Sequence, residues 1–258
     1  MSWLFGNQGN DLSPVEEPMR QWIDGAFLWL MKVFGEENIK NRKVLCPDFK
    51  DFSIKYNGEY QSLLDTSKII AGQMEINPDD IFFDVYTEGI KEINTGAGGY
   101  RIFMQNDEKT RFSAGMYWGR QEDGKYHVAI EKEGLSEPAK LIATIAHEFS
   151  HIKLLGEKRI TKNNEPLTEL VTIVFGLGVF NANSAFQFKR TTTSWGYSKM
   201  GYLSQMEWGY ALALFAHIRK EETPSWLVHL DRSIKADFKQ SRKFILKNPD
   251  KVFRKEKN

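Results

Sequence analysis

Two histidines and a glutamate stand close together in the stretch HEFSH at residues 147–151. His147 and His151 are four residues apart, so on an α-helix their side chains share one face and lie about 6 Å apart along the axis. Both imidazoles can then bind one metal ion, for which neutral histidine is a common ligand. Glu148 projects beside the same pocket, where it could accept a proton from a metal-bound water. The stretch therefore predicts a zinc site with its own general base.

The same residues could instead form a polar stripe on an ordinary buried helix. The flanking sequence favours the metal site, because a helix is expected to begin at Ser136, ahead of Pro138, directly after an extended region. Ile145, Phe149 and Ile152 then form an apolar face, and both histidines lie off it. The histidines are therefore expected on the polar side of a packed helix, where a site can form.

A catalytic zinc needs a third protein ligand as well as an open position. The next histidine is His217, and the longer pattern H-E-x-x-H-x-x-G-x-x-H is not met, because Leu154 replaces its glycine and Glu157 its last histidine. Glu157 is a minor candidate. The better candidates are Glu165 and Glu169, which are four apart at the start of an expected helix. One can bind the ion while the other accepts the N–H of a ligating histidine, unless both only complement the helix dipole.

With these residues, the sequence resembles the gluzincins, the zinc peptidases of thermolysin type. Their pattern is H-E-x-x-H on one helix and N-E-x-x-x-D or E-x-x-x-D on the next. HEFSH matches the first part and NEPLTE at residues 164–169 matches the second, with Glu169 in place of the usual aspartate. The spacer is shorter than in thermolysin and Pro166 directly follows Glu165. Which of the two glutamates binds the ion stays open.

The resemblance implies that His147, His151 and Glu165 bind one zinc ion per chain. It also implies that Glu148 is the general base and that Glu169 supports a ligating histidine through a hydrogen bond. The following stretch VTIVFGLGVFNANSAF also looks like that of uncharacterised bacterial H-E-x-x-H proteins. That second resemblance supplies no activity.

The elements around the motif are expected to form one domain over residues 1–258. Apolar spacing predicts helices at 15–34 and 59–76 and a strand or two within 43–56. The β-prone runs between 81 and 133 are IFFDVY, YRIFMQ, AGMYWGR and YHVAIEKE. The last two resemble a hairpin, and YHVAIEKE could be the sheet edge along which an extended peptide lies.

The second half of the chain is expected to be helical. After the motif helix, one helix runs from near Pro166 to residue 180, another starts at Ser204 with Glu207 as a capping box, and the last covers 225–246. The prediction is an α+β fold with a helix- and sheet-containing part (1–135) and a helical part that carries the site (136–258). The resemblance makes this fold zincin-like, with a small mixed sheet beside the active-site helix.

The bulk composition excludes several classes of function. The net charge of +1 gives no global attraction to nucleic acid, which makes a nucleic-acid partner unlikely on this ground. The single cysteine, Cys46, cannot form an internal disulfide, and the first residues lack the order of a signal peptide. The apolar runs are too short to cross a bilayer. We therefore expect a cytoplasmic protein without a membrane partner.

The expected function is zinc-dependent hydrolysis of peptide bonds in a peptide or protein substrate, by a metal-activated water. The alternative is a catalytically silent, peptidase-like domain that binds a partner or senses a signal. The intact Glu148 favours hydrolysis, because a structural site has no use for a base. Several residues could stabilise the oxyanion, and His217 among them is expected to be a core residue of an apolar helix. These candidates are Tyr197, Tyr202, Tyr210, His217 and His229.

Overall fold

The computed structural model describes residues 13–48, 50–87, 115–191 and 203–253. Within this part of the chain, eight α-helices and one small mixed sheet confirm the α+β class. The helices are α1 (Glu17–Phe34), α2 (Glu36–Asn41), α3 (Tyr60–Met74), α4 (Pro138–His151), α5 (Glu165–Val174), α6 (Gly178–Thr191), α7 (Gln205–Ile218) and α8 (Arg232–Lys247). The strands are β1 (Ile81–Tyr86), β2 (Gly115–Arg120) and β3 (Tyr126–Glu131).

The sheet has the strand order β1-β3-β2. β1 runs parallel to β3, with Ile81 opposite Tyr126, and β2 runs antiparallel to β3, with Gly115 opposite Ile130. The predicted hairpin is therefore confirmed as β2 and β3. The prediction that YHVAIEKE forms a sheet edge is wrong, because β3 pairs on both sides; β2 is an edge strand of the described sheet.

Of two further strand predictions, one is wrong and the other is not tested. Residues 43–56 contain no strand in their described part. The segment hydrogen-bonds elsewhere instead, with Leu45 N–H donating to the carbonyl of Gly176 at 2.8 Å and Gln73 Nε2 donating to that of Lys43 at 2.7 Å. The run YRIFMQ, at residues 100–105, lies outside the described residues.

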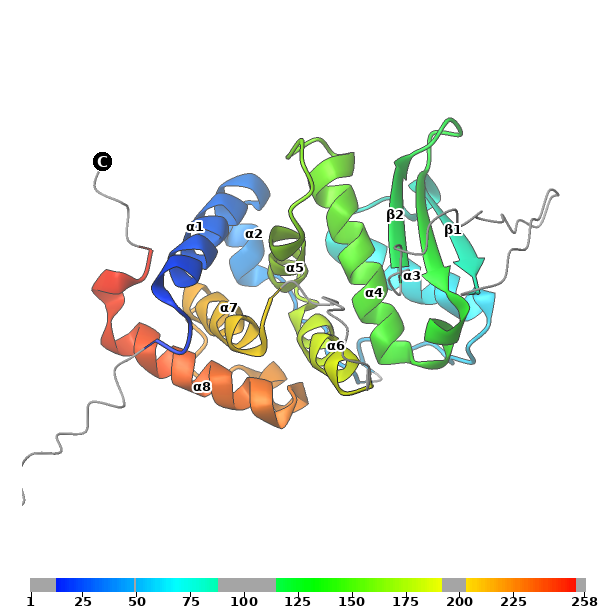
Figure 1. Cartoon of the computed structure of the whole chain (residues 1–258). Coiled ribbons are helices and arrows are strands. Elements are labelled where there is room, and N and C mark those ends of the chain that lie inside the picture. Colours follow the sequence, from blue (N-terminus) through cyan, green and yellow to red (C-terminus); the bar gives the residue numbers. More distant parts are fainter. Residues whose placement is uncertain (1–12, 49, 88–114, 192–202, 254–258) are drawn as a thin grey trace, which may run out of the picture.

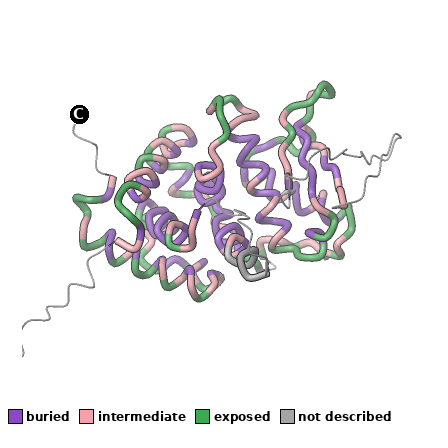
Figure 2. The backbone as a smooth tube through the Cα atoms, viewed as in Figure 1, coloured by how far each residue is buried: buried purple, intermediate pink, exposed green. Residues whose placement is uncertain are grey.

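Helix α4 lies between the sheet and the layer that contains α1, α5, α6, α7 and α8, with α3 behind it in the view of Figure 1. Its apolar side packs on the sheet through Phe149, whose ring centroid is 6.1 Å from that of Phe83 on β1. On the other side, Asn181 of α6 donates its Nδ2 to the carbonyl of Ala143 at 2.9 Å. Figure 2 shows buried backbone along α4, α5 and α7. The HEFSH helix is thus held from both sides in the core.

The start of α4 differs from the prediction in one detail. Glu137 precedes the first helical residue and makes no side-chain cap. Ser136 belongs to a short 3-10 turn (Lys132–Ser136), where its hydroxyl donates to the carbonyl of Glu133 at 2.7 Å. The cap predicted at Ser136 is wrong because this turn uses its hydroxyl, and Pro138 alone marks the start as expected.

The helix predicted from Pro166 to residue 180 is interrupted. α5 ends at Val174, and Gly176 turns the chain with φ +77 before α6 begins. A Cβ on Gly176 would collide with the carbonyl oxygen of Lys43. The absence of a side chain at Gly176 therefore lets the backbone of Lys43 pack closely against the turn after α5. The sequence does not reveal this break, because apolar residues continue on both sides of the stretch FGLG at residues 175–178.

The two later helix predictions hold in outline. The capping box of Ser204 and Glu207 is present at the start of α7. The predicted helix at 225–246 consists of a 3-10 turn (Ser225–His229) followed by α8. Over the described ranges, no helix is long and apolar enough to cross a membrane.

Replacing Gly176 by alanine should destabilise the protein strongly. The left-handed φ and the collision with Lys43 together should lower the free energy of unfolding by about 2–4 kcal/mol. Gly25→Ala is the matched control, because Gly25 is exposed within α1 and a Cβ there meets nothing; it should raise that free energy by about 0.5–1 kcal/mol. Urea unfolding of both variants tests this, and equal midpoints would contradict the turn at Gly176.

Candidate metal centre

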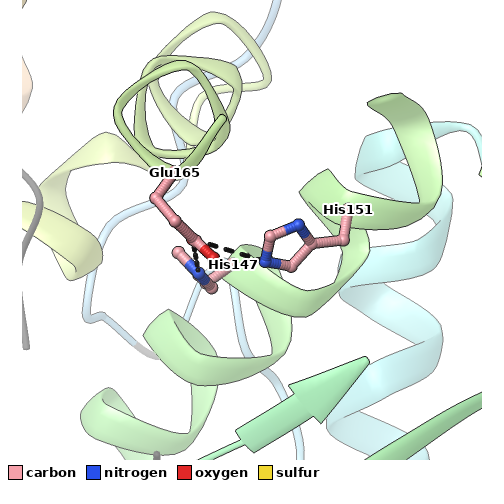
Figure 3. A group of neighbouring side chains, drawn as sticks. All are labelled: His147, His151 and Glu165. Atoms are coloured by element: carbon pink, nitrogen blue, oxygen red, sulfur yellow. Dashed lines mark ion pairs between the residues drawn. The ribbon is translucent and has the colours of Figure 1, made fainter. Parts of the chain in front are cut away.

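His147, His151 and Glu165 meet where α4 and α5 face one another. Nε2 of His147 lies 3.1 Å, and Nε2 of His151 3.5 Å, from the same oxygen, Oε2 of Glu165. Figure 3 shows Glu165 reaching from α5 toward the two imidazoles carried by α4. The ligand atoms of the three residues all lie within 4.8 Å of one another, close enough to hold a metal ion.

The start of α5 fixes the position of Glu165. Asn164 caps the helix, its Oδ1 accepting the N–H of Leu167 at 3.2 Å. Asn163 donates its Nδ2 to Oε1 of Glu165 at 2.7 Å. One carboxylate oxygen is therefore held by the preceding loop, and the other is directed at the histidines.

Within the described part of the chain, two buried atoms of this group stand out as unsatisfied, Oε2 of Glu165 and Nδ1 of His151. Oε2 faces the two Nε2 atoms at ion-pair distance. Buried polar atoms are nearly always satisfied, so an orphaned carboxylate oxygen facing two imidazole nitrogens fits a position from which a metal ion is bound. Two imidazoles and one carboxylate are also a donor set that divalent metals accept.

The protonation of the three residues is set by burial and by their mutual charges. Burial alone would lower the pKa of His147, but the Glu165 carboxylate, with the charges of Glu148 and Glu169, outweighs it and raises that pKa. Burial and the charge of His147 lower the pKa of His151. Burial opposes ionisation of Glu165, yet the two imidazoles hold its pKa below the ordinary value. His151 is thus neutral and Glu165 ionised, the forms that bind metal.

Glu148 lies beside this group, on the side of α4 that faces β2. Its side chain is buried, and burial raises the pKa of its carboxyl group to about 7. The backbone N–H of Tyr117 donates a hydrogen bond to it. A Cβ on Gly115 would lie 2.9 Å from Oε1 of Glu148 and closer still to Thr144, so the glycine lets β2 approach the carboxylate. Glu148 is placed to exchange protons near neutral pH.

Glu169 lies one helical turn beyond Glu165 and is buried. Its Oε2 accepts the backbone N–H of Leu203 at 2.7 Å, which fastens the chain before α7 to α5. Its charge contributes to the raised pKa of His147. The predicted support of a ligating histidine by Glu169 stays a prediction.

Glu157, the minor candidate ligand, is engaged elsewhere. It follows a π-helical turn (Ile152–Gly156) that extends α4 beyond His151. Its carboxylate pairs with Nζ of Lys153 at 2.7 Å and with the guanidinium of Arg159. It is not part of the group that could hold a metal.

The oxyanion candidates do not join the group in the described structure. Tyr197 and Tyr202 lie outside the described residues. Tyr210 is buried and donates its hydroxyl to Oδ1 of Asp24 on α1 at 2.7 Å. His217 is exposed on α7, so the expectation of a core histidine is wrong: it stands on the solvent side of that helix. His229 lies in the 3-10 turn before α8.

Tyr117 is the residue beside the site that the sequence did not reveal. Its ring stacks on the imidazole of His151, with centroids 5.9 Å apart and planes 10° from parallel. In the sequence it is one aromatic residue of a β-prone run, AGMYWGR, and nothing in that run points to the histidines. Only the placement of β2 against α4 brings it there.

Removing either histidine should abolish metal binding. The purified protein should carry about one divalent ion per chain, and His147→Ala or His151→Ala should lose most of it because two ligands cannot hold the ion tightly. His217→Ala, an exposed histidine on another helix, is the control and should keep it. Elemental analysis measures this, and unchanged metal in both site variants would refute the centre.

The two glutamates of α5 should differ in effect. Glu165→Ala should weaken metal binding more than Glu169→Ala, since only Glu165 faces both Nε2 atoms. Loss of a residue that merely supports a ligand typically costs about 10–100-fold in affinity. Glu157→Ala is the control and should leave affinity unchanged. Chelator-competition titrations that rank Glu169→Ala as the more damaging variant would reverse the assignment.

The chain was compared with known proteins in three ways. No family model matches its sequence, no curated protein matches it, and no solved structure matches its fold. A function for this chain must therefore be argued from the geometry and chemistry of the site itself.

Proposed function

We propose that this chain is a zinc-dependent peptidase of the zincin type. The observation that carries the proposal is the buried carboxylate of Glu148 directly beside the group formed by His147, His151 and Glu165. A metal site that serves stability alone has no use for a neighbouring base. A carboxyl group with a pKa near 7 beside three metal donors has the properties of a hydrolytic centre.

The donor set supports zinc as the ion. Donors about 2.0–2.2 Å from one tetrahedral ion are about 3.3–3.6 Å apart; the His151–Glu165 distance of 3.5 Å lies in this range and the His147–Glu165 distance of 3.1 Å lies slightly below it. Two histidines and one glutamate are a known ligand set of catalytic zinc, whereas structural zinc usually has four cysteine or histidine ligands. The three residues leave a fourth position for water or substrate.

Zinc held by His147, His151 and Glu165 would polarise a substrate carbonyl and favour ionisation of a nearby water. The protein's own contribution is the transfer of protons. Glu148 would accept a proton from the attacking water and return it to the leaving amine. The hydrogen bond from Tyr117 N–H holds one face of this carboxylate against β2.

The proposal includes a zincin-like arrangement of the α+β fold, in which the motif helix lies against the small sheet. The motif helix packs across the sheet through Phe149 and carries its histidines on the side facing α5. The substrate class that suits this chemistry is a peptide or protein, because its amide carbonyl needs polarisation and its leaving amine needs a proton.

Glu148→Gln should separate catalysis from metal binding. Glutamine can still accept the hydrogen bond from Tyr117, so metal content and melting temperature should stay near wild type. The amide cannot take a proton from water, so peptide hydrolysis should fall by about 10²–10⁴-fold. Cleavage of a mixed peptide library, read by mass spectrometry, measures the loss. Glu122→Gln, an exposed residue of the hairpin turn, is the matched control and should remain active.

Two results would argue against the proposal. Undiminished cleavage by Glu148→Gln would assign the activity to another residue or to a contaminant. Wild-type protein that binds zinc and cleaves no member of the library would favour the alternative, a peptidase-like domain that binds a partner or senses a signal.

A further inference from the structure

The imidazole of His151 is held in an unusual way for a metal ligand. A ligating histidine normally donates its second ring N–H to a carboxylate, a carbonyl or water, which fixes the orientation of the ring. Nε2 of His151 faces Glu165, and the buried Nδ1 makes no hydrogen bond to the described residues. Among these residues, the contacts that set the plane of the ring are aromatic.

The first of these contacts is the aromatic ring of Tyr117 on β2. The two rings are nearly parallel, at 10°, with centroids 5.9 Å apart, which is the range of an offset stack. On the same imidazole, the ring of His147 packs edge-on, with centroids 4.9 Å apart at 84°. The face of Tyr117 and the edge of His147 restrict rotation of His151 where no hydrogen bond does.

The backbone of the same residue acts on the base. Tyr117 N–H donates to the Glu148 carboxylate. Between Tyr117 and Arg120 the pairing of β2 with β3 is shifted in register, an irregularity of the kind that re-aims side chains next to active sites. A single residue of the edge strand thus contacts both a proposed ligand and the proposed base.

The chain leaves room for this ring. Gly156 ends the π-helical turn that follows His151, and a Cβ there would lie 2.9 Å from Oη of Tyr117 and 2.8 Å from Cε1 of Tyr126. The φ angle of Gly156 is not positive, so another residue could adopt this backbone conformation. A side chain at this position would instead collide with the rings of Tyr117 and Tyr126. π-helical turns are frequent at functional sites. This one brings Gly156 against the phenol ring of Tyr117.

We propose that Tyr117 is a positioning residue of the metal centre: its ring orients His151 by stacking, and its backbone N–H orients Glu148. The inference rests on the proposed zinc site and concerns residues of this chain outside the ligand set. The hydroxyl group of Tyr117 has no part in it. A phenylalanine at this position should therefore serve as well as the tyrosine.

The test compares three variants for zinc affinity by chelator competition and for the visible absorption of the cobalt-substituted protein. Tyr117→Phe should match wild type in both. Tyr117→Leu keeps apolar bulk and the N–H but loses the stack, and should weaken binding by about 10–100-fold and alter the cobalt spectrum. Tyr126→Leu removes a neighbouring ring, 6.3 Å from that of Tyr117, that makes no stack with His151; it should lower stability but keep the affinity and spectrum. If the leucine variant does not fold, Tyr117→Ile, which suits a strand better, replaces it.

Three outcomes would overturn the inference. The first is a Tyr117→Leu variant with the zinc affinity and cobalt spectrum of wild type. The second is a Tyr126→Leu variant that loses as much zinc affinity as Tyr117→Leu, because the loss would then reflect general packing. Wild-type protein that binds no divalent ion would overturn it together with the metal site. By contrast, protein that binds zinc and cleaves no peptide would refute hydrolysis alone, and the affinity comparison would still decide the role of Tyr117.

Discussion

The structure depends on the burial of ionisable groups between α4, α5 and β2. Glu148 and Glu169 are almost fully buried, Glu165 is mostly buried, and the imidazoles of His147 and His151 face Glu165. Taking a carboxylate out of water costs several kcal/mol unless a charge or hydrogen bond compensates it. The raised pKa of Glu148 and of His147 are direct consequences of this crowding. A divalent cation at the His147–His151–Glu165 group would balance the excess negative charge.

The surrounding fold holds these groups in place against their mutual repulsion. α4 is fixed on one side by the sheet and on the other by α6, through Phe149 and Asn181. Gly115 and Tyr117 bring β2 onto Glu148, and Asn163 and Asn164 direct Glu165. The contacts of α4 with the sheet and α6, and of β2 with Glu148, join segments that are distant in the sequence, whereas those of Asn163 and Asn164 are local to the start of α5. The site is therefore a property of the packed domain and not of one helix.

The interpretation as a hydrolase rests on chemistry within the site, because no similar protein supplies it. The three metal donors His147, His151 and Glu165, with the carboxyl group of Glu148 beside them, differ in number and type of residue from a structural zinc site of four cysteine or histidine ligands. Among the described residues, no hydrogen bond to Nδ1 orients the ring of His151. Stacking by Tyr117 gives a physical reason why the ring can still be held in one orientation.

Features that depend on local geometry can be predicted from the amino-acid sequence. The spacing of His147 and His151 and the apolar face of α4 follow from the helical period, and the capping box of α7 and the β2–β3 hairpin follow from short-range patterns. Helices α1 and α3 were predicted on the same ground. In each case neighbours in the chain carry the interaction, so the pattern is visible in the sequence.

Contacts between groups that are distant in the sequence became visible with the packed structure. It placed Glu165 at the histidines while Glu157 pairs with Lys153 and Arg159, a choice that depends on the path of the loop between α4 and α5. It broke the helix at Gly176, where the conflicting partner is a carbonyl more than a hundred residues earlier. It also made β2 an edge strand and brought Tyr117 to His151, because strand order is set by packing across the whole sheet and leaves no trace in the sequence of a single strand.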